Sequence, residues 1–161
     1  MFEMVLALII GILAAALVRL VVKAKNMALR FHQTFRDKFF EGANAIIDAD
    51  DVSETELNAI ATLAPLVRSR DGQKIAMKTF EHLLEGRLKS DTTSILAGVP
   101  VARQGQWRAM LFYWAVSACV AQGSLKGLNV LFQLLRYFGL ESGAVGEKVG
   151  HALSLEVASA H

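Results

Sequence analysis

The sequence predicts an all-α protein, with one N-terminal transmembrane helix followed by a compact bundle of about six or seven helices. Residues 2–22 form a long apolar run, later apolar residues recur at helical spacing, and no segment alternates as a strand would. At 161 residues the chain has room for one domain beside an anchor. We therefore expect an anchor with a basic flank over 1–26, a helical domain over 27–156 and a frayed tail over 157–161.

The composition narrows the classes of function. Hydrophobic residues make up 53% of the chain although 20% is charged, so the apolar excess must be concentrated, and much of it lies in the first 22 residues. The 17 basic and 15 acidic residues are too evenly balanced to predict a nucleic-acid partner. The single cysteine, Cys119, cannot form an internal disulfide, and its apolar neighbours indicate a small buried hydrophobe.

Residues 2–22 predict a membrane anchor because Glu3 and Arg19 are their only charges, and as a helix they would span about 31 Å, the thickness of the hydrocarbon layer. A cleaved secretory signal is the main alternative, since residues 14–16 are three alanines. Against it, Lys and Arg are missing before the apolar run, and the run continues past the alanines. The residues expected to mark the retained anchor are Met4, Leu8, Gly11, Leu17, Arg19, Lys23 and Lys25.

The basic residues near the anchor predict its orientation. They all lie on its C-terminal side, which the positive-inside rule assigns to the cytoplasm, so the N-terminus would face outward. Small residues at every fourth position, Ala7, Gly11 and Ala15, predict a face that can pack against a second helix. The basic residues are Arg19, Lys23, Lys25 and Arg30.

Residues 23–48 predict the first helix of the domain, and its continuity with the anchor is left open. Ser53 and Glu56 then predict a capping box at the start of the next helix, with Val52 and Leu57 as a hydrophobic staple. Pro65 should kink this helix or end it early. Its expected apolar side consists of Leu57, Ile60, Ala61, Ala64 and Val67.

The rest of the domain shows five further helical patterns. Asp71 and Gly72 predict a turn, with Asp71 capping a helix whose apolar stripe runs to Leu84. A short helix over 90–97 and a last helix over 142–157 flank two stronger patterns. Residues 107–121 are apolar nearly all round, which in so short a run favours a central buried helix over a second span, with Trp107 at the rim of the core. Residues 125–138 then carry the stripe Leu125, Leu128, Leu131, Phe132, Leu135 and Phe138.

Sites of chemistry are scarce in the sequence, and no cofactor or catalytic residue is predicted. An EF-hand loop starting at Asp48 fails at its fifth, sixth and twelfth positions, which are Val52, Ser53 and Ala59. The favoured interpretation of the acidic turn is stabilisation of the following helix dipole. Glu81, His82 and Glu85 are interpreted as a solvated polar face. The remaining metal candidates are Asp48, Asp50, Asp51 and Glu56.

Residues 43–63 and 116–135 share an order of helix, short polar turn, hydrophobe and helix, with Val52 and Leu125 in matching places. This arrangement resembles the internal pseudo-repeat of the tellurite-resistance TerB-like helical domains, whose turns read Ala-Asp-Gly-x-(Ile/Val/Leu)-Ser with a Glu shortly after. The resemblance would cover residues 28–153. The order of anchor, basic segment and domain is also similar to the N-terminal half of a membrane-anchored DnaJ-family co-chaperone, which implies a bacterial inner membrane.

The chain departs from that pattern at the residues that would carry chemistry. Gln122 stands where the family has Asp, Asn129 stands where a Glu is expected, and Asp50-Asp51 replaces the Asp-Gly step. The metal binding attributed to some relatives is therefore not carried over. The sequence has no His-Pro-Asp tripeptide, so the resemblance does not imply co-chaperone activity either.

These features together predict a non-enzymatic, single-pass membrane protein that contacts lipid through its N-terminal helix. Its cytoplasmic domain would serve as an adaptor or accessory subunit, with a protein partner in a membrane complex or in a second copy of the chain, and without nucleic acid. One alternative is a sensor that binds a divalent metal through the Asp48–Glu56 turn. Another is a membrane-perturbing protein in which the helices over 107–121 and 125–138 insert as well.

Overall fold

The structure is a computed structural model that describes residues 2–85 and 99–138. Over these ranges the chain is helical and contains no strand, which confirms the all-α class. The helices predicted over 90–97 and 142–157, and the tail over 157–161, lie outside the described residues. The elements are α1 (Phe2–Ile47), α2 (Glu54–Leu66), α3 (Arg70–Leu84), α4 (Val101–Cys119), the 3-10 turn η2 (Ala121–Gly123) and α5 (Leu125–Phe138).

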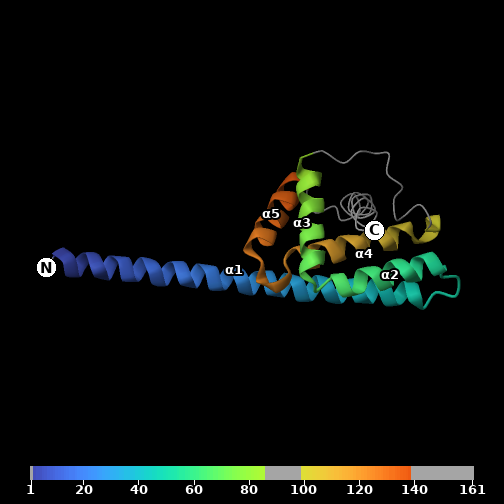
Figure 1. Ribbon diagram of the computed structural model, residues 1–161, viewed down its shortest axis with the longest axis horizontal. Coiled ribbons are helices and arrows are strands. Elements are labelled where there is room, and N and C mark those ends of the chain that lie inside the picture. The colour runs from blue at the N-terminus through green and yellow to red at the C-terminus, as the bar shows by residue number, and fades with distance from the viewer. Residues whose placement is uncertain (1, 86–98, 139–161) are drawn as a thin grey trace.

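Helix α1 joins the anchor to the domain without a break. Its 46 residues make a rod about 69 Å long. Figure 1 shows its N-terminal half projecting from the molecule and its C-terminal half lying along the bundle. The side chains over 5–22 are all exposed, whereas Ala28, Phe39, Ala43 and Ile46 are buried. One continuous helix therefore serves two environments, which the sequence had left open.

Helix α2 begins with the predicted capping box. The Glu56 N–H donates to the Ser53 hydroxyl, and the Glu56 carboxylate accepts from the Ser53 N–H in return. The helix ends at Leu66, one residue after Pro65, as the early-end prediction required. The predicted apolar side was partly wrong, because Ile60 and Val67 are buried as expected but Leu57 and Ala61 are exposed. The buried side is Glu56, Ile60, Leu63 and Val67, since a glutamate occupies the first core position.

Helix α3 begins earlier than predicted. Ser69, and not Asp71, is the cap, and its hydroxyl accepts from the Gly72 N–H at 2.8 Å. Asp71 lies in the first turn and pairs with Lys74 at 3.1 Å. Gly72 also lies inside the helix. A Cβ at this position would overlap the carbonyl oxygen of Leu66, the last residue of α2. Its role is a close approach between two helices, and not the predicted turn.

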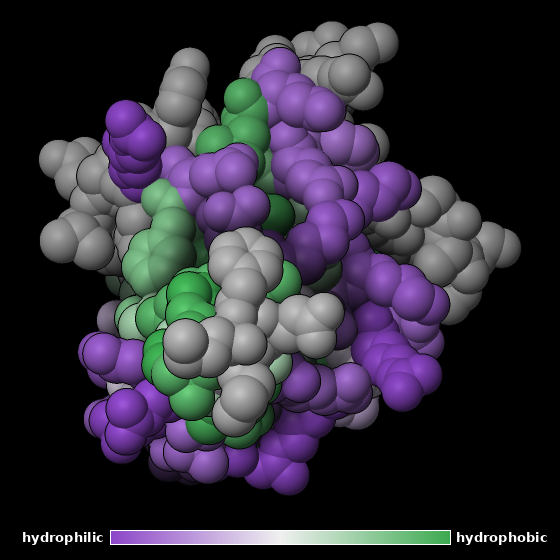
Figure 2. Space-filling view, turned by 90° about the vertical axis from the view of Figure 1, so that its left-hand side faces the viewer, coloured by the Kyte–Doolittle hydropathy of each residue, from purple (hydrophilic) through white to green (hydrophobic). Residues whose placement is uncertain are grey.

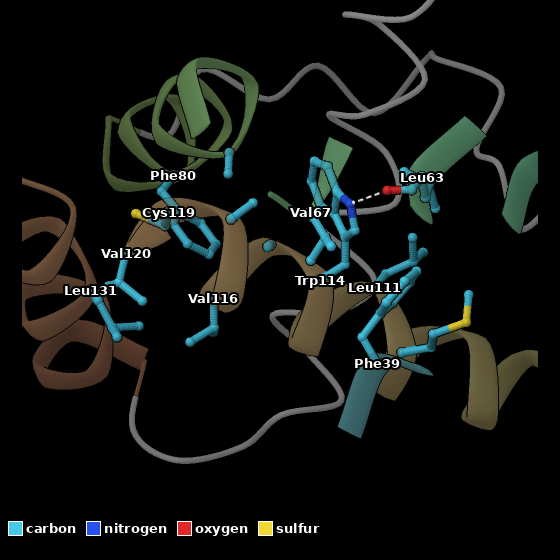
Figure 3. Close-up of a cluster of buried hydrophobic side chains, with 14 of the residues drawn as sticks. Phe39, Leu63, Val67, Phe80, Leu111, Trp114, Val116, Cys119, Val120 and Leu131 are labelled. Atoms are coloured by element: carbon cyan, nitrogen blue, oxygen red, sulfur yellow. Dashed lines mark hydrogen bonds between the residues drawn. The ribbon is translucent and has the colours of Figure 1, made fainter. Parts of the chain in front are cut away.

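Helix α4 is the central buried helix, as predicted. It packs against α1 and α3 and starts at Val101, before the predicted Trp107. Trp107 is fully buried and is not at the rim of the core. Figure 3 shows Trp114 beside the buried side chains of Val67 and Leu111, with its indole N–H donating to the Leu63 carbonyl at 2.9 Å.

The corner between α4 and α5 repeats the chemistry of the corner between α2 and α3. Ser124 caps α5 by accepting from the Gly127 N–H at 3.0 Å, and a Cβ on Gly127 would overlap the Cys119 carbonyl oxygen. Each corner therefore uses Ser-x-x-Gly to let one helix start against the last carbonyl of the helix before it. The predicted stripe of α5 was partly wrong, since Leu125 and Phe132 are 39% and 44% exposed.

Candidate functional site

The first feature with functional meaning is the anchor segment, residues 5–22. None of its side chains is buried in the bundle. In the part of the chain that the structure describes, α1 is the one helix that is long and apolar enough to cross a membrane. Leu8, Leu17 and Leu20 are each about two thirds exposed, at 66%, 64% and 65%. An apolar surface of this size has no stable place in water, so it requires lipid or other apolar partners.

The predicted anchor residues all lie on this projecting helix. Leu8, Gly11 and Leu17 are exposed within the segment, and a Cβ on Gly11 would meet nothing within 4 Å. The side chain of Met4 lies outside what the structure describes. A basic collar overlaps the end of the apolar run and continues beyond it, formed by the exposed residues Arg19, Lys23, Lys25 and Arg30.

The helical domain begins immediately at this collar. A Cβ on Gly123, in the turn between α4 and α5, would lie 3.6 Å from both the Lys25 carbonyl oxygen and the Leu29 side chain. Gln122 and Gly123 have positive φ angles of 57° and 70°, so the turn is tight where it meets α1. Lys25 is three residues, or about 4.5 Å, beyond Val22, the last apolar residue of the anchor. The base of the domain is therefore fixed close to the end of the anchor.

The second feature is an acid–arginine cluster in which Glu56, Arg103 and Trp107 are buried and Asp51 closes the exposed side. The Arg103 guanidinium donates to both oxygens of Glu56, from Nε at 3.1 Å and from Nη2 at 2.8 Å. It also donates to the Asp51 carboxylate, and Nη2 donates to the Asp51 backbone carbonyl at 3.0 Å. The Trp107 indole N–H completes the set by donating to Glu56 Oε1 at 3.0 Å.

The electrostatics of this cluster hold both charges in place. Burial raises the pKa of Glu56, but hydrogen bonds from the Ser53 N–H, Arg103 and Trp107 outweigh it and lower the pKa to about 2. The hydrogen bond to Glu56 raises the pKa of Arg103 against the opposing effect of burial. Both groups are charged at neutral pH, and the cluster ties the turn between α1 and α2 to the first turns of α4.

The structure brings two of the four predicted metal candidates to a guanidinium. Asp51 and Glu56 meet at Arg103, so the cation that these carboxylates face is already supplied by the chain. Asp48 and Asp50 are exposed beside them. Among the residues that the structure describes, no group of three or more His, Cys, Asp or Glu side chains is placed to hold a metal.

Arg103 was missed by the sequence analysis. The signal that would have found it is its spacing from Trp107, since residues four apart on a helix share one face and Trp107 is part of the core. A buried cation beside a core tryptophan needs an acid from another element. Glu56, whose capping role was predicted, supplies it.

The other polar residues of interest have structural partners. Glu81 pairs with Lys126 of α5 at 3.3 Å. His32 Nδ1 lies 3.0 Å from the Ser117 hydroxyl and 3.0 Å from the Ser117 carbonyl, which joins α1 to α4. Cys119 is fully buried, and burial raises the pKa of its thiol to about 12, as expected for a packed hydrophobe and not a nucleophile.

Comparisons with known proteins give no match of any kind. No family model matches the chain, and neither a curated protein nor a solved structure matches it. The resemblance to TerB-like domains therefore stays a prediction.

Proposed function

We propose that this chain is a single-pass membrane protein whose helical domain lies at the cytoplasmic face and binds another protein as an adaptor or accessory subunit. One observation carries the proposal. The apolar residues 5–22 project from the bundle and are all exposed, and they belong to the same helix that supplies Phe39 and Ile46 to the core. Burying that surface in lipid removes about 25 cal/mol per Å² of unfavourable contact with water.

The continuity of α1 supports a positioning role for the domain. A flexible linker would leave a domain free to rotate, whereas a helix that is both anchor and core wall fixes its height and its tilt. His32 and Ser117 and the acid–arginine cluster add polar contacts that tie α4 to α1 and to the turn after it. A rigidly presented domain suits a subunit that must meet a partner at a set distance from the bilayer.

The orientation is proposed from the basic collar. Its four cations lie at the C-terminal end of the apolar run and beyond it, whereas Glu3 precedes the run. Such an excess of basic residues on one flank retains that flank on the cytoplasmic side. The TerB-like resemblance would place a similar domain on that side of an inner membrane.

The two alternatives receive less support from the geometry. A divalent cation at the Asp48–Glu56 turn would compete with Arg103 for both oxygens of Glu56. Insertion of α4 into lipid would require Trp107 and Trp114 to leave a packed core and would abandon their hydrogen bonds. Calorimetric titration of the full-length protein with Ca²⁺, Mg²⁺ or Zn²⁺ tests the first alternative, and millimolar or tighter binding would restore it.

Membrane anchoring is tested in the full-length chain with two charges placed in the anchor. Ile9→Lys together with Leu13→Lys should move the protein from the carbonate-resistant membrane fraction to the aqueous fraction, because each lysine costs about 2.5–3.5 kcal/mol near the bilayer centre. The matched control is Asn58→Lys with Thr62→Lys, on the exposed side of α2, which should stay in the membrane. Recovery of the unchanged protein in the aqueous fraction would reject the anchor.

Orientation is tested by labelling single cysteines with a membrane-impermeant maleimide in intact and permeabilised cells. Lys74→Cys, on the exposed side of α3, should react only after permeabilisation, and buried Cys119 should stay unlabelled in both. Reaction of the introduced thiol in intact cells would place the domain on the outer side.

Partner binding is tested by incorporating a photo-crosslinking amino acid at Asn58 or Lys74 and irradiating cells. A discrete adduct with one other protein, which also co-purifies stoichiometrically in mild detergent, is the expected result. The same probe at Gly11 reports self-association through the small-residue face of the anchor. A monomer without adducts at every position would contradict the adaptor proposal.

A further inference from the structure

Helix α5 has one buried side and one exposed side of mixed character. The buried side packs on α3 through Leu128, Leu131 and neighbouring residues. The exposed side, called the outer face of α5, combines two cations, two large apolar side chains and two amides. The helix has no acidic residue. The outer face consists of Leu125, Lys126, Asn129, Phe132, Gln133 and Arg136.

The outer face of α5 is turned toward the side of the domain from which the anchor projects. Figure 1 shows α5 starting beside α1 and rising away from it on the side of the domain from which the anchor projects, with α3 next to it on the side away from the anchor. Since the buried side of α5 packs on α3, its outer face is turned toward the anchor side. Figure 2 views the molecule from that side, and hydrophilic side chains with smaller apolar areas surround the apolar end of α1.

The contact between Gly123 and α1 fixes the position of the start of α5 along the axis of the anchor. Gly123, two residues before α5, lies against the Lys25 carbonyl, about 4.5 Å beyond the last apolar residue of the anchor. A headgroup layer is about 5 to 7 Å thick on each side of the hydrocarbon. With the anchor across the bilayer, the start of α5 is therefore at the level of the headgroups.

We propose that the outer face of α5 rests on anionic phospholipid headgroups of the leaflet from which α1 emerges, so that the domain docks on the membrane at a second point. The inference rests on the proposed membrane anchoring. Lys126 and Arg136 would bind lipid phosphates, and Phe132 would enter the boundary between headgroups and acyl chains, as in other interfacial amphipathic helices. Docking would fix the rotation of the domain about the anchor.

Charge and position favour a lipid surface over a protein on this face. Lys25 of α1, which is exposed and whose backbone carbonyl lies against Gly123, adds positive charge beside the start of α5. The acid opposite is Glu81 of α3, which pairs with Lys126, and the Lys126 side chain is still 71% exposed. Anionic headgroups attract each such cation by an amount that corresponds to about a fivefold change in docking.

The test uses full-length protein with Cys119→Ala, reconstituted into vesicles, and an environment-sensitive fluorophore on one introduced cysteine. The vesicles are phosphatidylcholine alone or phosphatidylcholine mixed with phosphatidylglycerol. A probe on Asn129→Cys should shift to the blue in the anionic vesicles and less in the neutral ones. A probe on Thr62→Cys, on the exposed side of α2, should report water in both. A probe on Leu13→Cys reports insertion of the anchor.

Charge variants then test the recognition itself. Lys126→Gln with Arg136→Gln should lower the docking equilibrium by about 25-fold, and about 1 M salt should reverse docking in the unchanged protein. The matched control, Lys74→Gln, removes a cation that is equally exposed, at 79%, but lies on α3, and it should have no effect.

The outcomes separate the two proposals. If the Leu13 probe reports water, the anchor itself fails. If that probe is in lipid while the Asn129 probe reports water, anchoring stands and docking of α5 is overturned, which leaves the face for a protein partner. Equal blue shifts in both vesicle types, unchanged by the charge variants, would overturn recognition of anionic headgroups.

Discussion

At the scale of single residues, Glu56 has the largest structural role of any charged side chain described. It caps α2, accepts from the Trp107 indole and neutralises Arg103, all while only 1% exposed. A carboxylate at such a position is stabilising only while its partners remain, because an uncompensated buried charge is strongly unfavourable. The fold therefore depends on a contact between two elements that are 47 residues apart in the chain.

Glu56→Gln should lower the free energy of unfolding by about 3 kcal/mol, because it leaves the buried Arg103 without its main counter-charge. Glu54→Gln, two residues earlier in the same helix turn but exposed, should change it by no more than about 0.5 kcal/mol. Urea denaturation followed by tryptophan fluorescence measures both variants. Equal effects of the two substitutions would show that the cluster contributes no more than a surface charge.

The low pKa of Glu56 also predicts a dependence of stability on pH. The folded-state pKa of about 2 is below the ordinary value of 4.5, so the unfolded chain binds the proton more readily. The stabilisation is therefore complete above pH 4.5 and is lost as the pH falls toward 2. Denaturation midpoints between pH 7 and pH 2 should fall in the unchanged protein, and the difference from Glu56→Gln should shrink over this window. A difference in midpoint between the two proteins that stays constant with pH would contradict the low pKa of Glu56.

At the scale of elements, the two Ser-x-x-Gly corners determine how the helices cross. In each corner the serine hydroxyl caps the new helix, and the glycine makes room for the last carbonyl of the previous helix. The sequence had indicated another internal repeat, in which the turn at Val52 matches the turn at Leu125. The structure shows that the corner at Gly127 has the same chemistry as the corner at Gly72, and the signal was the shared spacing from serine to glycine.

Gly72→Ala and Gly127→Ala should each lower the free energy of unfolding by about 2–3 kcal/mol, since the added methyl group overlaps a backbone carbonyl that cannot move alone. Gly105→Ala is the matched control, because it is exposed within α4 and its Cβ would meet nothing within 4 Å. That substitution should be neutral or stabilising by up to about 1 kcal/mol. Thermal unfolding of the three variants decides, and destabilisation by all three would indicate that crowding is not the cause.

At the scale of the whole molecule, the anchor segment and the bundle are energetically separate although one helix joins them. Residues 5–22 bury nothing, and α1 first contributes to the core at Ala24 and Ala28. The stability of the bundle therefore depends on its own packing and not on residues 5–22, whose exposed apolar surface stays available for lipid or another apolar partner.

Deletion of residues 1–22 should give a soluble, helical protein whose thermal unfolding midpoint is within a few degrees of that of the full chain in detergent, because no core contact is lost. Analytical ultracentrifugation and circular dichroism check the result. A fragment that stays in the carbonate-resistant membrane fraction would support the alternative in which α4 and α5 insert as well, whereas membrane binding that about 1 M salt reverses would reflect docking of α5. A fragment that fails to fold would show that the exposed segment supports the bundle.

The sequence by itself determined the helical class, the long apolar N-terminal helix with its basic flank and the capping box of α2, because these depend on local composition, on spacing and on residues three positions apart. Only the tertiary structure decided that Glu56 takes a core position, that Arg103 pairs with it, and that Gly72 lies at a helix crossing instead of in a turn. The first two depend on partners 47 and 51 residues apart in the chain, and the third depends on how α3 packs against the Leu66 carbonyl at the end of α2. Local patterns treat glutamate and arginine as solvated, and burial is set by the elements that surround them.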